Sequence, residues 1–89
     1  MATHHITITG KVQGVFFRAT AKKVALAMGL SGWVKNTDKG EVEIMASGDA
    51  EKLASFENWC QSGPPEAEVQ HVVVTSGEET LFQDFKIIR

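Results

Sequence analysis

The sequence predicts an α+β fold in which two helices cover one face of an antiparallel sheet. Three observations favour this fold class. Residues 5–9 alternate polar and apolar side chains, as a strand with one buried face does. In residues 17–28 and 49–60 the apolar side chains recur at the spacing of an amphipathic helix. Residues 37–40 are of the types that form turns, and they connect two further segments with strand patterns. The resulting order, β-α-β-β-α-β, contains two right-handed crossovers and is that of a ferredoxin-like sandwich.

The first half of the chain contains one strand, one helix and a hairpin. The helix has a single apolar stripe, formed by Phe17, Ala21, Val24, Ala25 and Met28. Gly29 follows this stripe and is a natural C-terminal cap. Residues 32–36 and 41–47 have strand patterns, and the Thr-Asp-Lys-Gly turn between them predicts a hairpin. The buried face of the second of these strands should carry Val42, Ile44 and Ala46.

The second half begins with a helix that has clear start and stop signals. Asp49 is a good N-cap, because its carboxylate can accept hydrogen bonds from the first backbone N–H groups. The apolar stripe of this helix consists of Leu53, Phe56 and Cys60. A Ser-Gly-Pro-Pro sequence at residues 62–65 then ends the helix.

A fourth strand is expected at about residues 67–75. Val69 and Val72 are out of phase with strict alternation, which indicates a bulge or an irregular start. A polar loop follows, and residues 85–87 form a short extra strand near the carboxyl end. No linker, repeat or low-complexity segment divides the chain, so we expect residues 1–89 to form a single domain.

Size and composition restrict the class of protein. The chain has 89 residues and is 43% hydrophobic, which is enough for one core without covalent cross-links. The single cysteine, Cys60, excludes an intramolecular disulfide framework and a cysteine-rich zinc site. The amino terminus lacks the pattern of a secretory signal, and no apolar run approaches the roughly 18 residues that a membrane span needs. We therefore expect a cytoplasmic protein, a monomer, with no membrane partner.

Charge is distributed unevenly along the chain. The formal net charge of −2 argues against a general nucleic-acid binder. Residues 11–39 nevertheless contain six basic side chains against one acidic side chain, a net charge of +5, and the remainder carries −7. If residues 11–39 form one end of the molecule, their potential would attract a small anion.

The loop Gly10-Lys-Val-Gln-Gly-Val-Phe-Phe-Arg18, between the first strand and the first helix, is the strongest candidate for a functional site. Two glycines four residues apart permit a tight turn whose N–H groups point inward, and such a concavity at a helix N-terminus binds anions. Arg18 adds a planar guanidinium that fits a phosphate bidentately. The loop matches neither the P-loop nor the dinucleotide fingerprint. A plain strand-to-helix turn with a solvated arginine therefore remains an alternative.

The chain resembles the acylphosphatase family in two signature segments, which occur in the same order and with the same spacing. These segments are Gly10–Arg18 and Gly32-Trp-Val-Lys-Asn-Thr-Asp-Lys-Gly40. The similarity covers nearly the whole chain. The resemblance implies hydrolysis of a small-molecule acyl phosphate to a carboxylate and inorganic phosphate. Arg18 matches the family's substrate-binding arginine, and Asn36 matches the catalytic asparagine that orients the attacking water. The backbone N–H groups that would hold the phosphate oxygens are those of Gln13, Gly14, Val15, Phe16 and Phe17.

This chemistry is plausible without a metal or a cofactor. An acyl phosphate is an activated mixed anhydride with a carboxylate leaving group, so it needs positioning and charge stabilisation rather than a strong acid or a nucleophilic side chain. Asn36 cannot take a proton and can only orient water. The proton of that water must therefore leave through the substrate's own phosphate or through bulk water.

Other candidate sites and functions are weaker. His4, His5 and His71 show no metal-ligand spacing and are expected at the surface or partly buried, with the first two at an end that can fray. An RNA platform would need aromatic side chains on the central strands. A non-catalytic module that binds phosphate would retain Arg18 and the loop but would gain nothing from Asn36.

Overall fold

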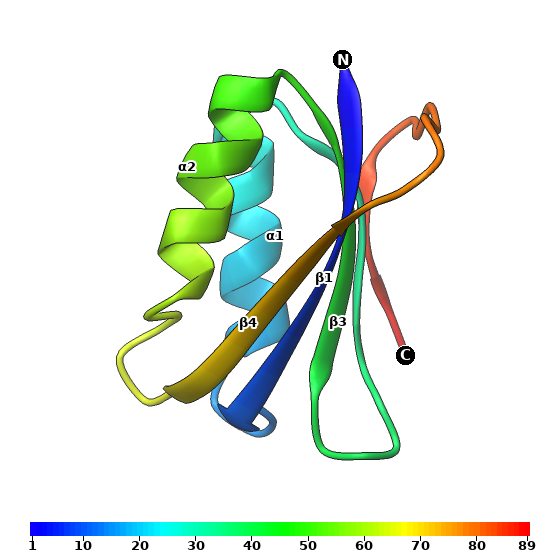
Figure 1. The fold of residues 1–89 in the computed structure, drawn as a ribbon. Helices are drawn as coiled ribbons and strands as arrows, with labels where there is room; N and C mark the ends of the chain where they lie inside the picture. Colours follow the sequence, from blue (N-terminus) through cyan, green and yellow to red (C-terminus); the bar gives the residue numbers. More distant parts are fainter.

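The computed structural model describes residues 1–89 and contains two helices and five strands. In chain order, the elements are β1 (Ala2–Lys11), α1 (Phe17–Ala27), β2 (Ser31–Asn36), β3 (Val42–Gly48), α2 (Ala50–Cys60), β4 (Glu68–Ser76) and β5 (Phe85–Ile88). Both helices lie side by side on one face of the sheet, and the other face is open (Figure 1). The predicted ferredoxin-like α+β fold is confirmed.

The strands form one mixed sheet in the order β4-β1-β3-β2-β5. The pairs β1–β3, β1–β4 and β2–β3 are antiparallel, as predicted, whereas β5 pairs with β2 in parallel. The parallel pairing follows from chain direction, because β5 returns antiparallel to β4 and therefore runs the same way as β2. The expected antiparallel sheet is correct for the first four strands and needs this amendment for the fifth.

The core lies between the helices and the sheet. Sixteen hydrophobic side chains are buried there, and the predicted buried face of β3, with Val42, Ile44 and Ala46, is confirmed. On α1 the buried stripe is narrower than predicted, because Val24 and Met28 are only partly buried at its edge. Aromatic rings tie the helices to each other and to β5, with centroid distances of 5.4 Å for Phe17–Trp59 and 6.3 Å for Phe56–Phe85.

Local signals in the sequence also appear in the structure. The Asp49 side chain accepts a hydrogen bond from the Glu51 N–H at 2.8 Å, as predicted for the N-cap of α2. The predicted bulge is present where the β1–β4 register shifts between Thr9 and Gly10. Gly10 has a φ of 125°, and a Cβ there would lie 2.2 Å from the Glu68 carbonyl oxygen. Glycine is therefore required where β1 leads into the loop.

The two neighbouring histidines lie within β1 and not at a frayed end. His4 Nδ1 contacts Glu57 of α2 at 2.5 Å, and His5 Nε2 contacts Glu43 of β3 at 2.5 Å. Glu43 also lies 3.5 Å from Lys35 Nζ. Hydrogen bonding to His5, assisted by the charges of His5 and Lys35, lowers the pKa of the Glu43 carboxyl below its usual value.

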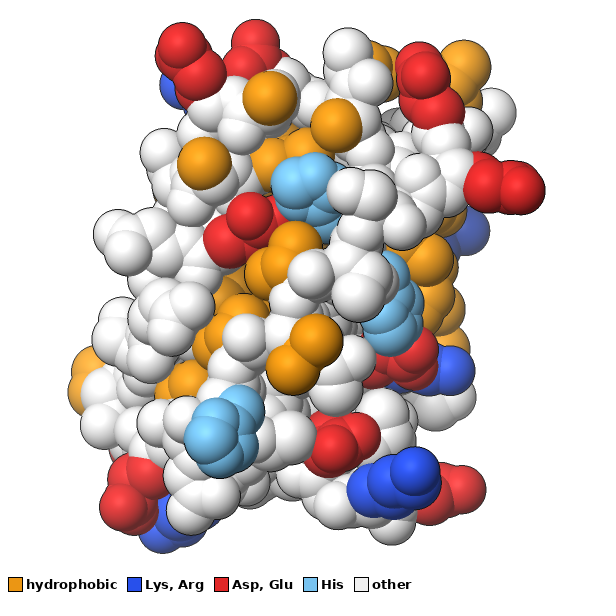
Figure 2. Space-filling model, viewed as in Figure 1, with side chains coloured by type: hydrophobic (Ala, Val, Ile, Leu, Met, Phe, Trp, Pro, Cys, Tyr) orange, Lys and Arg blue, Asp and Glu red, His pale blue; other side chains and the backbone are white.

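The face over β4 and α2 carries no concentration of positive charge. Figure 2 shows hydrophobic side chains in the middle of this face, with single basic side chains scattered near its rim. Val73 and Val74 of β4 are among the exposed hydrophobic residues. Neither α1 nor α2 has the length and hydrophobicity that would allow it to cross a bilayer.

Candidate active site

The loop between β1 and α1 adopts an unusual backbone conformation. Gly14 has a φ of 73° and Phe16, the residue that precedes α1, has a φ of 65°. A left-handed conformation costs a non-glycine residue about 1–2 kcal/mol, so the surrounding structure must hold Phe16 in place. Val12 and Val15 provide this anchorage, because their side chains are buried in the core on either side of Gly14.

The same loop leaves a run of backbone donors without acceptors. None of the seven successive N–H groups of residues 13–19 donates to a protein atom, and the first backbone bond of the helix is that from Thr20 N to the Phe16 carbonyl. Helix α1 also lacks a side-chain cap and has no acidic residue in its first turn. Backbone donors are normally paired, so this stretch can hold an anion with several oxygens.

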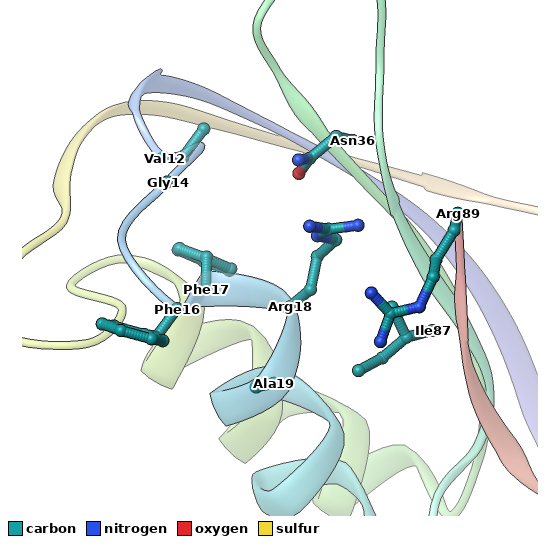
Figure 3. A pocket seen from close by; sticks show the side chains of 9 residues that line it. All are labelled: Val12, Gly14, Phe16, Phe17, Arg18, Ala19, Asn36, Ile87 and Arg89. Carbon is teal, nitrogen blue, oxygen red and sulfur yellow. The ribbon is translucent and has the colours of Figure 1, made fainter.

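A pocket of about 290 Å³ opens beside this loop. Three polar side chains line it, those of Arg18, Asn36 and Arg89, and no acidic side chain does. The remaining lining residues are Gly14 and the apolar Val12, Phe16, Phe17, Ala19 and Ile87. Arg18 extends from the first turn of α1 with its guanidinium directed toward Asn36 (Figure 3). The structure therefore brings the two predicted catalytic residues together, although they are 18 positions apart in the sequence.

Asn36 reaches the pocket because of its place in β2. Val34 is buried under the helices, so Asn36, two residues later, points to the same face at the end of the strand. Its side-chain oxygen, Oδ1, is buried and has no hydrogen-bond partner. An unpaired buried acceptor costs about 1–3 kcal/mol, and such groups in native proteins call for an explanation. A bound water or substrate that donates to Oδ1 would provide one.

Gln13 contributes a contact that the sequence analysis missed. Its side-chain Nε2 donates to the carbonyl oxygens of Thr37 and Glu41, both at 2.9 Å. These carbonyls belong to the turn between β2 and β3, directly after Asn36. The Gln13 side chain therefore fixes the loop to the hairpin that carries Asn36.

The predicted phosphate-binding residues occupy different positions around the pocket. Gly14, Phe16 and Phe17 line it, whereas Gln13 and Val15 do not, so only their backbone N–H groups can contribute. The Phe16 side chain is 75% exposed. The Phe17 side chain is buried against Trp59 and holds the start of α1 against α2.

Arg89 and Ile87 are pocket residues that the sequence analysis did not single out. Val34 pairs with Ile87 and Lys35 with Ile88 in the parallel register of β2 and β5. One residue further, Asn36 and Arg89 project to the same face. The alternation of Phe85, Ile87 and Arg89 was the available signal, but it has a meaning only once β5 is known to lie beside β2.

Other reactive side chains lie outside this site. Cys60 is buried in the core, and this burial raises the pKa of its thiol to about 12, so the thiolate is absent at neutral pH. No group of three or more His, Cys, Asp or Glu side chains is arranged to hold a metal ion. His71 lies exposed on β4.

Comparisons with known proteins agree on one family. A model of the family "Acylphosphatase" matches residues 4–87. An acylphosphatase of Cupriavidus pinatubonensis is 46% identical over 87 residues, which cover 98% of this chain and 96% of that protein. Among solved structures, an acylphosphatase from Bacillus subtilis superposes with a TM-score of 0.96 at 37% identity and full coverage of both chains. An acylphosphatase from Coxiella burnetii gives a TM-score of 0.95 at 38% identity, with 98% and 92% coverage.

Proposed function

The chain belongs to the acylphosphatase family and is an enzyme of acyl phosphate hydrolysis, and we propose that it works without a metal ion, with Arg18, Asn36 and the β1–α1 loop as its active site. The observation that carries this proposal is the run of unpaired N–H groups at residues 13–19, which adjoins a pocket lined by both side chains.

The loop binds the phosphoryl group of the substrate. Its free N–H groups and the start of α1 stabilise negative charge on the phosphoryl oxygens, and the Arg18 guanidinium adds two parallel donors. Charge on these oxygens is what an enzyme of phosphoryl transfer must stabilise. Because the loop is fixed by Val12, Val15 and Gln13, its donors need little rearrangement during the reaction.

Asn36 positions the attacking water. The buried Oδ1 accepts a hydrogen bond from the water and so directs a lone pair of the water oxygen toward phosphorus. The new bond joins this oxygen to phosphorus, and the bond between phosphorus and the acyl oxygen breaks. The carboxylate leaves as a stable anion without a general acid, and a phosphate oxygen of the substrate takes the proton of the water.

Hydrolysis of benzoyl phosphate by the purified protein, with a chelator present, tests this proposal. We expect turnover in the wild type, none measurable in Arg18→Ala, and no rescue in Arg18→Lys, because a point charge cannot replace the planar guanidinium. Lys23→Ala is the matched control, since it removes an exposed charge from α1 outside the pocket. Loss of wild-type activity in chelator would refute the metal-free reaction, and full activity of Arg18→Ala would refute the proposed site.

A second outcome would favour the non-catalytic alternative. If the folded wild type bound inorganic phosphate but hydrolysed no acyl phosphate, the domain would be a phosphate-binding module.

We also propose that the protein acts as a cytoplasmic monomer on a small-molecule substrate, with no nucleic-acid or membrane partner. One core inside 89 residues supports the monomer, and size-exclusion chromatography tests it.

A further inference from the structure

Two buried hydroxyl groups of the sheet bind the backbone of the loop between β4 and β5. Thr3 of β1 and Ser47 of β3 lie opposite each other, and they are the molecule's two buried polar residues, 4% and 2% exposed. Thr3 Oγ1 accepts a hydrogen bond from the Thr80 N–H at 3.0 Å, and Ser47 Oγ donates to the Thr80 carbonyl oxygen at 2.9 Å. The two hydroxyls therefore hold both backbone groups of one loop residue, and we call this arrangement the Thr80 clamp.

The Thr80 clamp is a closed ring of donors and acceptors. A serine or threonine hydroxyl has one proton to donate. The Ser47 proton is directed to Thr80, so the 2.5 Å contact between the two hydroxyl oxygens must contain the proton of Thr3. Each hydroxyl then donates once and accepts once. Because both are buried, they depend on Thr80 for partners that water does not supply.

The Thr80 clamp restrains the loop that leads directly into β5. This loop, residues 77–84, is almost entirely exposed. Its backbone is otherwise hydrogen-bonded to the sheet at its two ends, through the Gly77 N–H and the Asp84 carbonyl oxygen. Thr80 is therefore the attachment in the middle of the loop, and four residues, 81–84, separate it from the start of β5. A short tether of this kind limits the movement of the strand that follows it.

Strand β5 extends from the clamped loop to the pocket. It runs parallel to β2, so it begins beside Gly32, and its last residue pairs with the residue before Asn36. Ile87 and Arg89, at the far end, form one wall of the pocket, and the Arg89 guanidinium is directed toward α1 (Figure 3). Because β5 is an edge strand of four residues, the place of this wall depends on contacts outside the strand itself.

We propose that Thr3, Ser47 and Thr80 are positioning residues for the pocket. Their clamp holds β5 so that Arg89 presents its charge to a bound anion. This inference rests on the proposed function. Arg89 forms no salt bridge with a carboxylate of the protein, so its charge is available to that anion. The β1–α1 loop and Asn36 are held by other contacts, so the clamp should affect the binding of the substrate and not the chemical step.

The experiment measures kcat and KM for benzoyl phosphate in the wild type, Thr3→Val, Thr3→Ser and Thr7→Val. Thr3→Val keeps the shape of the side chain but loses the hydroxyl. The rise in KM is limited by what the exposed Arg89 contributes, so we expect about threefold with kcat unchanged. Thr3→Ser retains the hydroxyl and should retain the KM. Thr7→Val, the matched control, removes a hydroxyl from the same face of β1, beside Glu43, and should change neither constant.

A double-mutant cycle identifies the route of the effect. In the Arg89→Gln background, Thr3→Val should leave KM unaltered, because the charge that the clamp positions is absent. An equal rise of KM in both backgrounds would place the effect outside β5 and overturn the inference. A wild-type KM in Thr3→Val, whatever its free energy of unfolding, would show that the clamp is only structural and would also overturn it.

Phosphate binding separates this inference from the proposed function. The Kd of inorganic phosphate, measured by calorimetry, does not depend on turnover. It should rise about threefold in Thr3→Val and stay the same in Thr7→Val. A wild type that binds phosphate but hydrolyses no acyl phosphate would contradict the proposed function, and the ratio of these dissociation constants would still support the clamp. An equal Kd in the wild type and Thr3→Val would overturn it.

Discussion

Replacement of Asn36 by alanine should separate activity from stability. The Oδ1 atom of Asn36 is buried and accepts no hydrogen bond from any protein atom, so the fold itself does not compensate this acceptor for its burial. Its value to the protein then lies in the water that it orients during the reaction. Asn36→Ala removes both the unpaired acceptor and the means of positioning this water.

The structure sets the expected magnitudes. Loss of a preorganised hydrogen-bonding group typically lowers kcat by about 10²–10³-fold. An unpaired buried acceptor costs about 1–3 kcal/mol, and its removal is offset by the loss of the partly buried side chain. We therefore expect the free energy of unfolding of Asn36→Ala to equal that of the wild type or to exceed it by up to about 1 kcal/mol. An ordinary structural asparagine would give the opposite sign.

The assay pairs steady-state hydrolysis of benzoyl phosphate with urea denaturation of the same preparations. Thr9→Val is the matched control, because Thr9 Oγ1 is the other unpaired buried side-chain atom and Thr9 does not line the pocket. Thr9→Val should gain stability and keep its kcat. Either of two results would refute the reasoning: an Asn36→Ala variant that keeps full kcat, or one that loses activity together with more than about 1 kcal/mol of unfolding free energy.

Two further predictions concern the support of the site and its dependence on pH. Gln13→Met loses both hydrogen bonds to the β2–β3 turn. It should lower the free energy of unfolding by about 1–2 kcal/mol and kcat by about tenfold. The control Gln70→Met, at an exposed residue of β4, should change neither quantity. Because His5 lowers the pKa of Glu43 in the folded state, the stabilisation from this carboxylate is fully present above its ordinary value of 4.5 and is lost as pH falls through the lower folded value. Urea denaturation between pH 3 and 7 should therefore show that Glu43→Gln has a lower free energy of unfolding than the wild type near neutrality, and that this difference becomes smaller in acid. Glu79→Gln, in an exposed loop, is the control. A difference for Glu43→Gln that is constant with pH, or an equally large difference for Glu79→Gln, would contradict this prediction.

The parts of the fold that short-range patterns determine were predictable from the sequence. The hairpin, the cap at Asp49 and the phase change between Val69 and Val72 that indicates the bulge each depend on residues within a few positions of one another. The direction and neighbour of β5 were not predictable in this way. Four residues, Phe85–Ile88, contain no information about which edge of the sheet they join, and that pairing depends on where the other strands lie.

The same distinction applies to the site. Arg18 and the loop are continuous in sequence, and their role in anion binding follows from local chemistry. Arg89 enters the pocket only through the parallel pairing of β5, so no local pattern could connect it with Asn36. The side-chain contacts of Gln13 and of His4 join residues 24 or more positions apart, and they depend on the packed fold.

The unpaired groups of the β1–α1 loop and of Asn36 have a physical meaning because they lie around the same pocket. The loop of residues 13–19, with its free N–H groups, and Asn36 both contribute lining residues to this pocket, although a small domain has little stability to lose. Val12, Val15 and Gln13 hold this loop rigid, so that its donors cannot turn to other partners. A substrate that supplies phosphoryl oxygens and a water satisfies these groups at once. Saturating phosphate should accordingly raise the unfolding free energy of the wild type, and an equal rise in Arg18→Ala would show that the anion binds elsewhere.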